Sequence, residues 1–279
     1  MVLFHHGMEL KLKAGHFFGT TSQALSVNGF RFTEKAYSSS ARLPNHAHEL
    51  SHFCFVLSGT YNEDIRGNSF QRAPAALVYY PPDVSHGESH LTNGRHFLVE
   101  IDIEGLRKVR DYGVRLSDPL LVNGDVSLWL ATRMYREFRE RDEFSALVLE
   151  SIATELLVAA SRQHTQSPER KSPPWLRTVK DFLRDNFAEP PRLDEIANAV
   201  GIHPTHLARV FRQFEHCTVG DYIRQLRIDY ARERLVGSNE PLVEIALAAG
   251  FADHTHFTRS FKRITGMTPT EFRSLFKSR

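Results

Sequence analysis

Two segments near the carboxyl end of the chain gather basic, polar and small side chains on one face of a helical pattern. Arginine can form a forked pair of hydrogen bonds with guanine O6 and N7, threonine and histidine can bond other base edges, and an alanine methyl can meet that of thymine. Such a mixture suits the major groove of double-stranded DNA. The faces consist of Thr205, Ala208, Arg209 and Arg212 in the first segment, and of His254, Thr255, Thr258, Arg259 and Lys262 in the second.

Both segments belong to an internal repeat. Residues 193–201 align with residues 242–250, at an offset of 49 residues, and residues 209–218 align with residues 259–268, at an offset of 50 residues. Each copy predicts a short helix with small alanines, a glycine at the turn and a second helix with an apolar stripe, which is a helix-turn-helix unit. The helical pattern of residues 220–237 would span about 27 Å, which brings the two second helices near the roughly 34 Å repeat of B-DNA.

The chain before these helices changes character twice. Residues 1–120 carry short β-type runs separated by glycine, proline and asparagine turns, which predict an all-β barrel or sandwich. Residues 121–162 carry two runs of helix-period apolar residues, which predict a helical hairpin. Residues 163–174 hold three prolines and no apolar residue, and so predict a linker. With about seven helices in residues 175–279, the expected fold class is α+β with several domains.

Composition excludes several classes of protein. The 279 residues are 41% hydrophobic and 24% charged, with a net charge of +2, which is typical of a globular chain and excludes disordered and collagen-like proteins. We find no apolar run long enough to cross a membrane and no signal peptide. Cys54 and Cys217 lie far apart in apolar patterns and indicate reduced thiols. We therefore expect a cytoplasmic protein that contacts no membrane.

Three stretches of the last domain carry a family resemblance: LDEIANAVGIHPTHLARVFRQF, YIRQLRIDYARERL and VEIALAAGFADHTHFTRSFKRITGMTPTEFR. Together they resemble the DNA-binding domain of AraC/XylS-type transcription regulators, over residues 175–279. The resemblance implies that the second helix of each unit enters the major groove. It also implies base contacts from Thr205, Ala208 and Arg209 in the first unit, and from His254, Thr255, Thr258 and Arg259 in the second.

Two positions depart from the pattern of this family. His216 stands where the second copy has Gly266, so a left-handed turn there would be strained. Ala208 stands where the family often has a longer polar side chain. We therefore expect the first unit to read fewer bases directly than the second.

Histidines in the first domain carry a second resemblance. The spacing H-x-H-x3-H-x6-G up to Gly59, followed by P-x-D-x2-H, resembles the two metal-binding motifs of cupin barrels, with His52 in place of the usual glutamate and Asp83 in place of the usual glycine. In a metal-binding cupin the ligands would be His46, His48, His52 and His86, because neutral imidazoles on neighbouring strands converge inside the barrel.

The same four histidines have two other interpretations. The sensor cupins of AraC-type regulators resemble this pattern, bind a small effector and commonly hold no metal, which makes the histidines the lining of an effector pocket. Alternatively, the imidazoles only satisfy one another and nearby backbone groups. We rank the effector pocket first, the structural role second and the metal site third, and we expect His90 and His96 to be ordinary strand or surface residues.

We expect a sequence-specific DNA-binding transcription regulator that responds to a small-molecule effector in a cupin-like barrel, and no enzymatic activity. The hairpin has an apolar stripe, including Leu149 and Leu156, which we expect to pack either against the barrel or against a second copy of the hairpin. We favour the second copy, and therefore a homodimer. RNA polymerase is a further expected partner. The alternatives are a metal-dependent cupin enzyme with a regulatory DNA-binding tail, and a constitutive DNA-binding protein whose barrel only dimerises.

Overall fold

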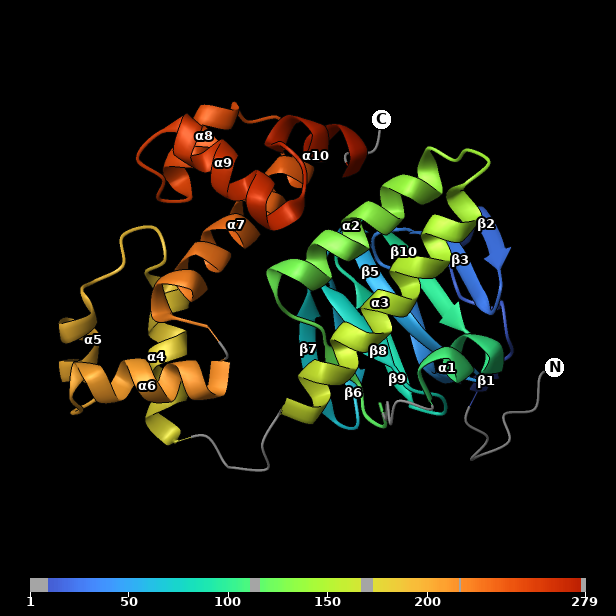
Figure 1. Ribbon diagram of the computed structural model, residues 1–279, viewed down its shortest axis with the longest axis horizontal. Helices are drawn as coiled ribbons and strands as arrows, with labels where there is room; N and C mark the ends of the chain where they lie inside the picture. The colour runs from blue at the N-terminus through green and yellow to red at the C-terminus, as the bar shows by residue number, and fades with distance from the viewer. Residues whose placement is uncertain (1–9, 111–115, 167–172, 216, 277–279) are drawn as a thin grey trace. The chain divides into compact units, whose positions relative to one another are not determined.

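The computed structural model describes residues 10–110, 116–166, 173–215 and 217–276. Contacts between Cα atoms divide the chain into an amino-terminal unit, residues 1–164 with 275–279, and a carboxyl-terminal unit, residues 165–274. All strands of the described residues lie in the first unit, and helices make up the second (Figure 1). The prediction of a sheet-rich region followed by a helical region is therefore confirmed.

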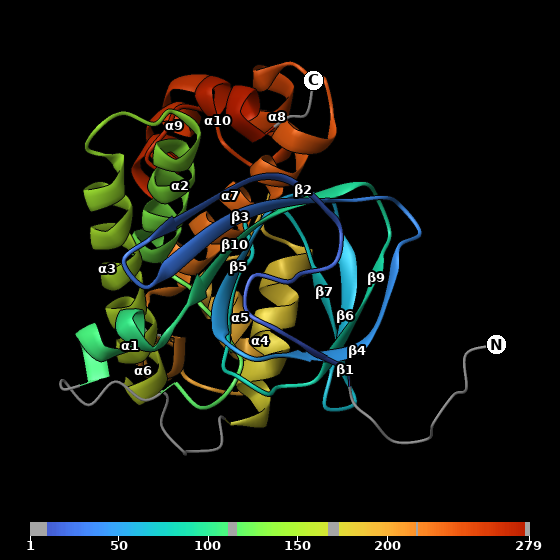
Figure 2. The same cartoon turned by 90° about the vertical axis from the view of Figure 1, so that its right-hand side faces the viewer.

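The strands of the amino-terminal unit form two sheets that face each other (Figure 2). Every strand pair is antiparallel except the parallel pair of β1 and β4. No pairing among the described strands closes the two sheets into a single barrel. One sheet has the order β1 (Leu10–Leu12), β4 (Arg42–His48), β9 (His86–His90), β6 (Tyr61–Ile65), β7 (Asn68–Arg72), and the other β11 (Leu120–Leu121), β8 (Leu77–Tyr80), β5 (Ser51–Ser58), β10 (Gly94–Ile101), β3 (Phe30–Tyr37), β2 (Thr20–Val27).

Strand β5 lies inside the six-stranded sheet, between β8 and β10. Its eight residues are all buried, which explains why its sequence is a nearly continuous apolar run rather than an alternating one. One face of this sheet points to the space between the sheets. Helices α2 (Asp125–Arg139) and α3 (Ser145–Gln166) cover the other face (Figure 1), where the Phe97 ring lies 5.0 Å from the Phe138 ring.

The helical hairpin corrects one expectation. Leu149 and Leu156 are fully buried in the single chain, so the stripe packs inside the protomer, which is the alternative that we ranked below the dimer interface. Dimerisation itself stays a prediction. Helix α3 also continues to Gln166, so the first residues of the predicted linker are helical, while residues 167–172 lie outside the described part of the chain. The short helix α1 (Ile103–Arg110) precedes the hairpin.

The helices of the carboxyl-terminal unit enclose an apolar core. Leu176, Ile196, Leu207 and Phe211 are buried together in its first half, and Phe257 is buried in its second. No helix in the described residues is both long and apolar enough to cross a membrane. The helices are α4 (Pro174–Asp185), α5 (Leu193–Ala199), α6 (Pro204–Glu215), α7 (Val219–Gly237), α8 (Leu242–Ala248), α9 (His254–Thr265) and α10 (Pro269–Phe276).

Candidate functional site: two helix faces and a buried histidine cluster

Helices α5 and α6 form the first helix-turn-helix unit. The Glu195 carboxylate accepts a hydrogen bond of 3.0 Å from the Arg192 backbone N–H, and this satisfies a backbone donor that the first turn of α5 leaves open. Gly201 then turns the chain at a φ of 70°, a left-handed conformation that favours glycine. Leu207 and Phe211 are buried on one side of α6, so the opposite side of the helix faces outward.

The outward side of α6 carries the predicted DNA-contacting residues of the first unit. Thr205, Arg209 and Arg212 are exposed, and Ala208 is half-buried. These residues line a groove of about 680 Å³ together with Thr218 and the first residues of α7. Because the amino end of a helix carries partial positive charge, this groove offers a cationic and concave surface to a phosphate backbone.

Helices α8 and α9 repeat this arrangement with a tighter turn. Gly250 has a φ of 81°, and a Cβ atom there would lie 2.3 Å from the Ala188 carbonyl oxygen, so only glycine fits. The Asp253 carboxylate accepts a hydrogen bond of 2.7 Å from the His256 backbone N–H and caps the start of α9. Phe257 and Phe261 bury one side of α9 and aim the other outward.

The outward side of α9 carries the predicted residues of the second unit. His254, Thr255, Arg259 and Lys262 are exposed, and Thr258 is half-buried. Neither Arg259 nor Lys262 forms a salt bridge with another described residue, so both cations remain available to a phosphate or a base. The 19 residues of α7 separate the two helix-turn-helix units, with α6 near one end of α7 and α8 and α9 near the other (Figure 1).

His216, which departs from the family pattern, lies outside the described residues. In the amino-terminal unit, the structure explains why Asp83 can replace the usual glycine of the cupin motif. Asp83 adopts a φ of 62°, the left-handed conformation for which the cupin motif usually has glycine. Its side chain is exposed and pairs with Lys11 at 2.5 Å, so Asp83 is no part of the buried cluster.

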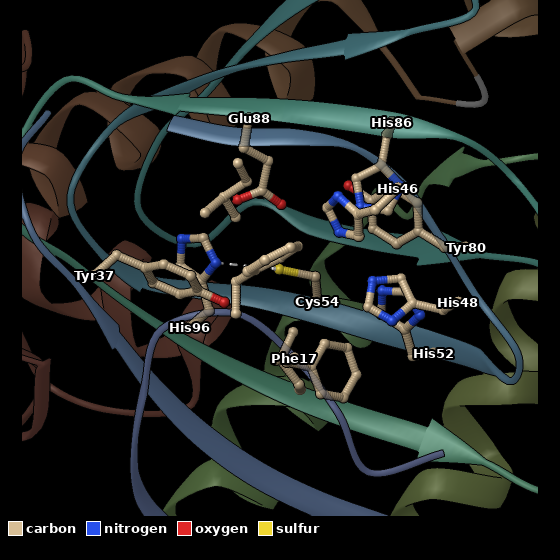
Figure 3. Close-up of a pocket in the computed structure, with 13 residues that line it drawn as sticks. Phe17, Tyr37, His46, His48, His52, Cys54, Tyr80, His86, Glu88 and His96 are labelled. Atoms are coloured by element: carbon tan, nitrogen blue, oxygen red, sulfur yellow. Dashed lines mark hydrogen bonds between the residues drawn. The ribbon is translucent and has the colours of Figure 1, made fainter. Parts of the chain in front are cut away.

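The four predicted histidines meet between the two sheets. His46 and His48 come from β4, His86 from β9 and His52 from β5 of the opposite sheet, and each is at most 4% exposed (Figure 3). Nitrogen atoms of His46, His48 and His86 all lie within 4.8 Å of one another, a separation at which the three could hold one metal ion. The ring of His52 stands beside this group, with its centroid 4.5 Å from that of His48.

Backbone carbonyl groups orient two of these rings. His46 Nδ1 donates to the Pro44 carbonyl oxygen at 2.8 Å, and His86 Nδ1 donates to the Val84 carbonyl oxygen at 3.3 Å. A histidine whose Nδ1 is occupied in this way keeps the lone pair on Nε2, which is the atom that then binds a metal ion or a polar ligand. His48 Nδ1 is buried and has no hydrogen-bond partner among the described residues.

Burial keeps this cluster uncharged at neutral pH. Desolvation lowers the pKa of His46 and His86 below the ordinary value, and it lowers the pKa of His48 to about 3, with the neighbouring imidazoles adding to the effect. Neutral imidazole is the form that accepts a hydrogen bond or coordinates a metal ion. The cluster is therefore a set of neutral nitrogen donors.

The structure adds residues to this cluster that sequence reasoning missed. Glu63 on β6 accepts a hydrogen bond from Arg72 Nε at 2.8 Å and another from the Tyr80 hydroxyl. The carboxylates of Glu63 and Glu88 lie close enough to His86 to form a second group of possible metal ligands. The alternation of His86 and Glu88 along one strand is the signal that could have identified Glu88.

His90 and His96 lie on strands, which confirms one of the two alternatives expected for them. They are 4% and 1% exposed and belong to the interior between the sheets. Cys54 is a buried thiol whose Sγ lies 3.8 Å from His96 Nδ1, and Cys217 is half-buried. The chemistry of the interior thus extends beyond the four predicted histidines.

The space left between these side chains is small. A cavity of about 10 Å³ is lined by Phe17, His46, His48, His86 and neighbouring side chains (Figure 3). A volume of this size holds about one water molecule. The interior therefore has room for an ion or a water molecule, and an organic ligand would have to displace side chains.

Comparisons with known proteins match a family model within the carboxyl-terminal unit. Residues 196–274 match a helix-turn-helix domain family. The chain is 39% identical over 99 residues to the probable transcription factor PqrA of Proteus vulgaris, a match that covers 36% of this chain and 77% of PqrA. It is 31% identical over 103 residues to the bifunctional transcriptional activator/DNA repair enzyme AdaA of Bacillus subtilis, covering 37% of this chain and 49% of AdaA.

A solved structure of a transcriptional regulator with an AraC-type DNA-binding domain, from Chromobacterium violaceum, is 31% identical and covers 37% of this chain and 92% of that one, with a TM-score of 0.36. The chain spans about half the length of AdaA, so the activity of that whole protein is not carried over. The match to most of PqrA, together with the repeated helix-turn-helix units, shows that the chain belongs to the family of AraC-type transcription regulators.

Proposed function

We propose that this protein is a sequence-specific regulator of transcription that binds double-stranded DNA through α6 and α9 and responds to an effector held between its two sheets. The observation that carries the DNA-binding part is the pair of outward helix faces on a repeated scaffold. Arg212, Arg259 and Lys262 on these faces form no salt bridge with another described residue, and such unpaired cations favour a polyanionic partner.

The two faces divide the work of recognition. Arg259 and the exposed His254 and Thr255 offer donors for base edges in the second unit. In the first unit only Thr205 and Arg209 have that reach, because Ala208 ends in a methyl group. Phosphate contacts from Arg212, Lys262 and the amino end of α7 would hold both helices in register.

The sensing role belongs to the amino-terminal unit, which we take as a cupin-like domain. Its buried histidines and glutamates are costly to desolvate and serve no purpose in DNA binding, which favours a separate ligand-responsive role. A cavity of about 10 Å³ gives an organic substrate no room, so sensing is favoured over catalysis. Homodimerisation, contact with RNA polymerase and a cytoplasmic location are further parts of this proposal.

Arginine substitutions test the DNA-binding part. We expect Arg259→Ala to weaken binding of the full chain to a selected DNA site by about 1–3 kcal/mol and to relax base preference at one position. Arg209→Ala should act in the same way at another position. The measurement is a titration of fluorescent DNA, run on selected and random sequences, with Arg184→Ala as the control because Arg184 is a similarly exposed arginine on α4.

Two results would contradict this proposal. Equal weakening on selected and random DNA would assign both arginines to phosphate contacts rather than base recognition. Binding that does not change with salt would contradict DNA recognition altogether, because neutralised phosphates release counterions and make the logarithm of affinity fall linearly with the logarithm of salt concentration.

A further inference from the structure

We propose that the effector sensed by this protein is a divalent transition-metal ion, bound by His46, His48 and His86. This inference rests on the proposed function, since it names the ligand class of the sensing site. It reverses the order expected from the sequence, in which an organic effector came first and a metal came last. Four features of the described residues carry it.

The first feature is convergence. One nitrogen from each of His46, His48 and His86 lies within 4.8 Å of the other two, and all three residues are buried. Their ring centroids are 4.4 Å apart for His46 and His86 and 5.0 Å apart for His46 and His48. Buried imidazoles that only filled a core would have no reason to aim their nitrogens at one point.

The second feature is orientation. His46 and His86 each donate from Nδ1 to the carbonyl oxygen two residues earlier in the chain, Pro44 and Val84. These bonds hold each ring in place and leave the lone pair on Nε2, and a hydrogen bond of this kind is the usual outer support of a metal-binding histidine. His48 Nδ1 is buried without a partner among the described residues, so an ion would satisfy a polar atom that is otherwise unpaired.

The third feature is size. The cavity of about 10 Å³ at the cluster accepts one water-sized particle. A hydrated ion that exchanges its waters for imidazole nitrogens needs no more room than this. An organic effector would have to displace the rings of Phe17, His52 and Tyr80, which contact one another or the cluster at centroid distances of 4.7 to 5.2 Å.

The fourth feature is the donor set, which indicates the kind of ion. Three imidazoles with no carboxylate among them suit Zn²⁺, Ni²⁺ or Cu²⁺, whereas Mg²⁺, Ca²⁺ and Mn²⁺ prefer oxygen ligands. Glu63 and Glu88, each with a carboxylate oxygen within 4.8 Å of a His86 nitrogen, place negative charge near the ion.

The position of the site also suits regulation. His46, His48 and His86 belong to the five-stranded sheet, whereas His52 belongs to β5 of the opposite sheet. With its ring 4.5 Å from that of His48, His52 is the nearest link from the ion to the sheet that α2 and α3 cover. Filling the site thus changes the packing across the interior rather than at one edge.

The test uses the full chain, stripped of metal with a chelator. We expect one equivalent of Zn²⁺ or Ni²⁺ to bind and to raise the melting temperature, whereas Mg²⁺ has no effect. His48→Gln and His86→Gln should each weaken metal binding at least about tenfold. The matched control is His96→Gln, a buried histidine in the same interior but outside the ligand group, and it should bind metal like the unmodified chain.

A second measurement needs no substitution and so does not depend on the variants folding. Co²⁺ added to the unmodified chain should give the visible absorption of a nitrogen-ligated ion and should be displaced by Zn²⁺. The link to regulation is then measured as the affinity for selected DNA with and without Zn²⁺. We expect a change between about 5-fold and 150-fold, the usual range of coupling between two sites.

The outcomes separate this inference from the proposed function. A stripped chain that binds selected DNA but takes up no Zn²⁺, Ni²⁺ or Co²⁺ would overturn the metal inference and leave the DNA-binding function standing. A bound ion that leaves the affinity for DNA unchanged, or that persists unaltered in His48→Gln and His86→Gln, would also overturn it. One bound equivalent in a chain that never binds DNA would overturn the regulatory inference together with the DNA-binding function, while leaving a metal site.

Discussion

The two units of this protein keep their polar chemistry in opposite places. The amino-terminal unit buries much of it between two sheets, whereas the carboxyl-terminal unit packs an apolar core and holds most of its polar groups outside. Histidine shows the contrast best, because the residue type is the same and only the surroundings differ. In the amino-terminal unit the buried histidines are His46, His48, His52, His86, His90 and His96, while His16 is exposed; in the carboxyl-terminal unit the exposed histidines are His203, His206, His254 and His256.

This contrast teaches how each unit can use its side chains. An exposed polar group costs little free energy of folding and meets a large partner, as a DNA-binding face must. A buried polar group is costly to desolvate and meets only what fits inside, as a sensor of a small ligand must. The following substitutions and pH changes test the contrast, from the largest expected effect to the smallest.

Removal of one charge should have very different effects in the two units. Glu63 is fully buried and accepts hydrogen bonds from Arg72 and Tyr80, so Glu63→Gln leaves a buried guanidinium without its counter-charge. We expect a loss of about 3–5 kcal/mol in the free energy of unfolding, measured by urea denaturation. The matched change, Asp181→Asn, breaks an ion pair whose two side chains are more than half exposed, and should cost about 0–1 kcal/mol. Similar losses in the two variants would contradict the contrast.

The two turn glycines compare packing within the helical unit. Gly250→Ala places a Cβ atom 2.3 Å from the Ala188 carbonyl oxygen and also strains a φ of 81°, so we expect a loss of about 3 kcal/mol in the free energy of unfolding. Gly201 has a similar φ of 70° but no atom within 4 Å of a Cβ, so Gly201→Ala should cost only about 1 kcal/mol. Thermal unfolding of both variants measures the difference, and equal costs would mean that backbone strain alone decides.

Acidification should weaken the amino-terminal unit. Burial lowers the pKa of His96 to about 4, below the ordinary value of 6.5. The unfolded chain therefore binds a proton at His96 between pH 6.5 and pH 4 when the folded chain does not. Stability is complete above pH 6.5 and falls as the pH drops, by up to about 1.4 kcal/mol per pH unit from this histidine.

Melting curves between pH 7.5 and pH 5 measure this effect. His96→Phe removes one titrating group and should make the dependence of the melting temperature on pH less steep, while His46, His48 and His86 keep part of it. The control is His206→Phe, which changes an exposed histidine of the other unit and should leave the dependence as it is. A dependence that stays equally steep in His96→Phe would assign acid sensitivity to other groups.

Much of the helical unit could be predicted from the sequence. The repeat of residues 193–201 and 242–250, with a glycine at the end of each copy, indicated two turns, and both glycines have a positive φ. The apolar stripes predicted which side of each second helix is buried, and Leu207 and Phe257 are buried on that side. These predictions succeeded because a helix-turn-helix unit depends on contacts between residues near in sequence.

Less of the structure of the two sheets could be predicted from the sequence. The motif spacing predicted that His46, His48 and His86 lie together. It did not indicate that Glu63 on β6 and Glu88 on β9 lie close to His86. A shift of one residue in the pairing of two strands moves every side chain to the opposite face. The register of distant strands therefore had to be observed.

The sequence by itself determined the class of each unit, the positions of the two helix-turn-helix turns and the residue types on α6 and α9, since local periodicity and backbone preference decide these features. Only the tertiary structure decided what covers the Leu149 and Leu156 stripe, because an apolar stripe shows that something must pack on it but not what. It also decided the size of the space between the sheets. That volume is the small remainder after many side chains from distant strands have packed, and no local pattern contains it.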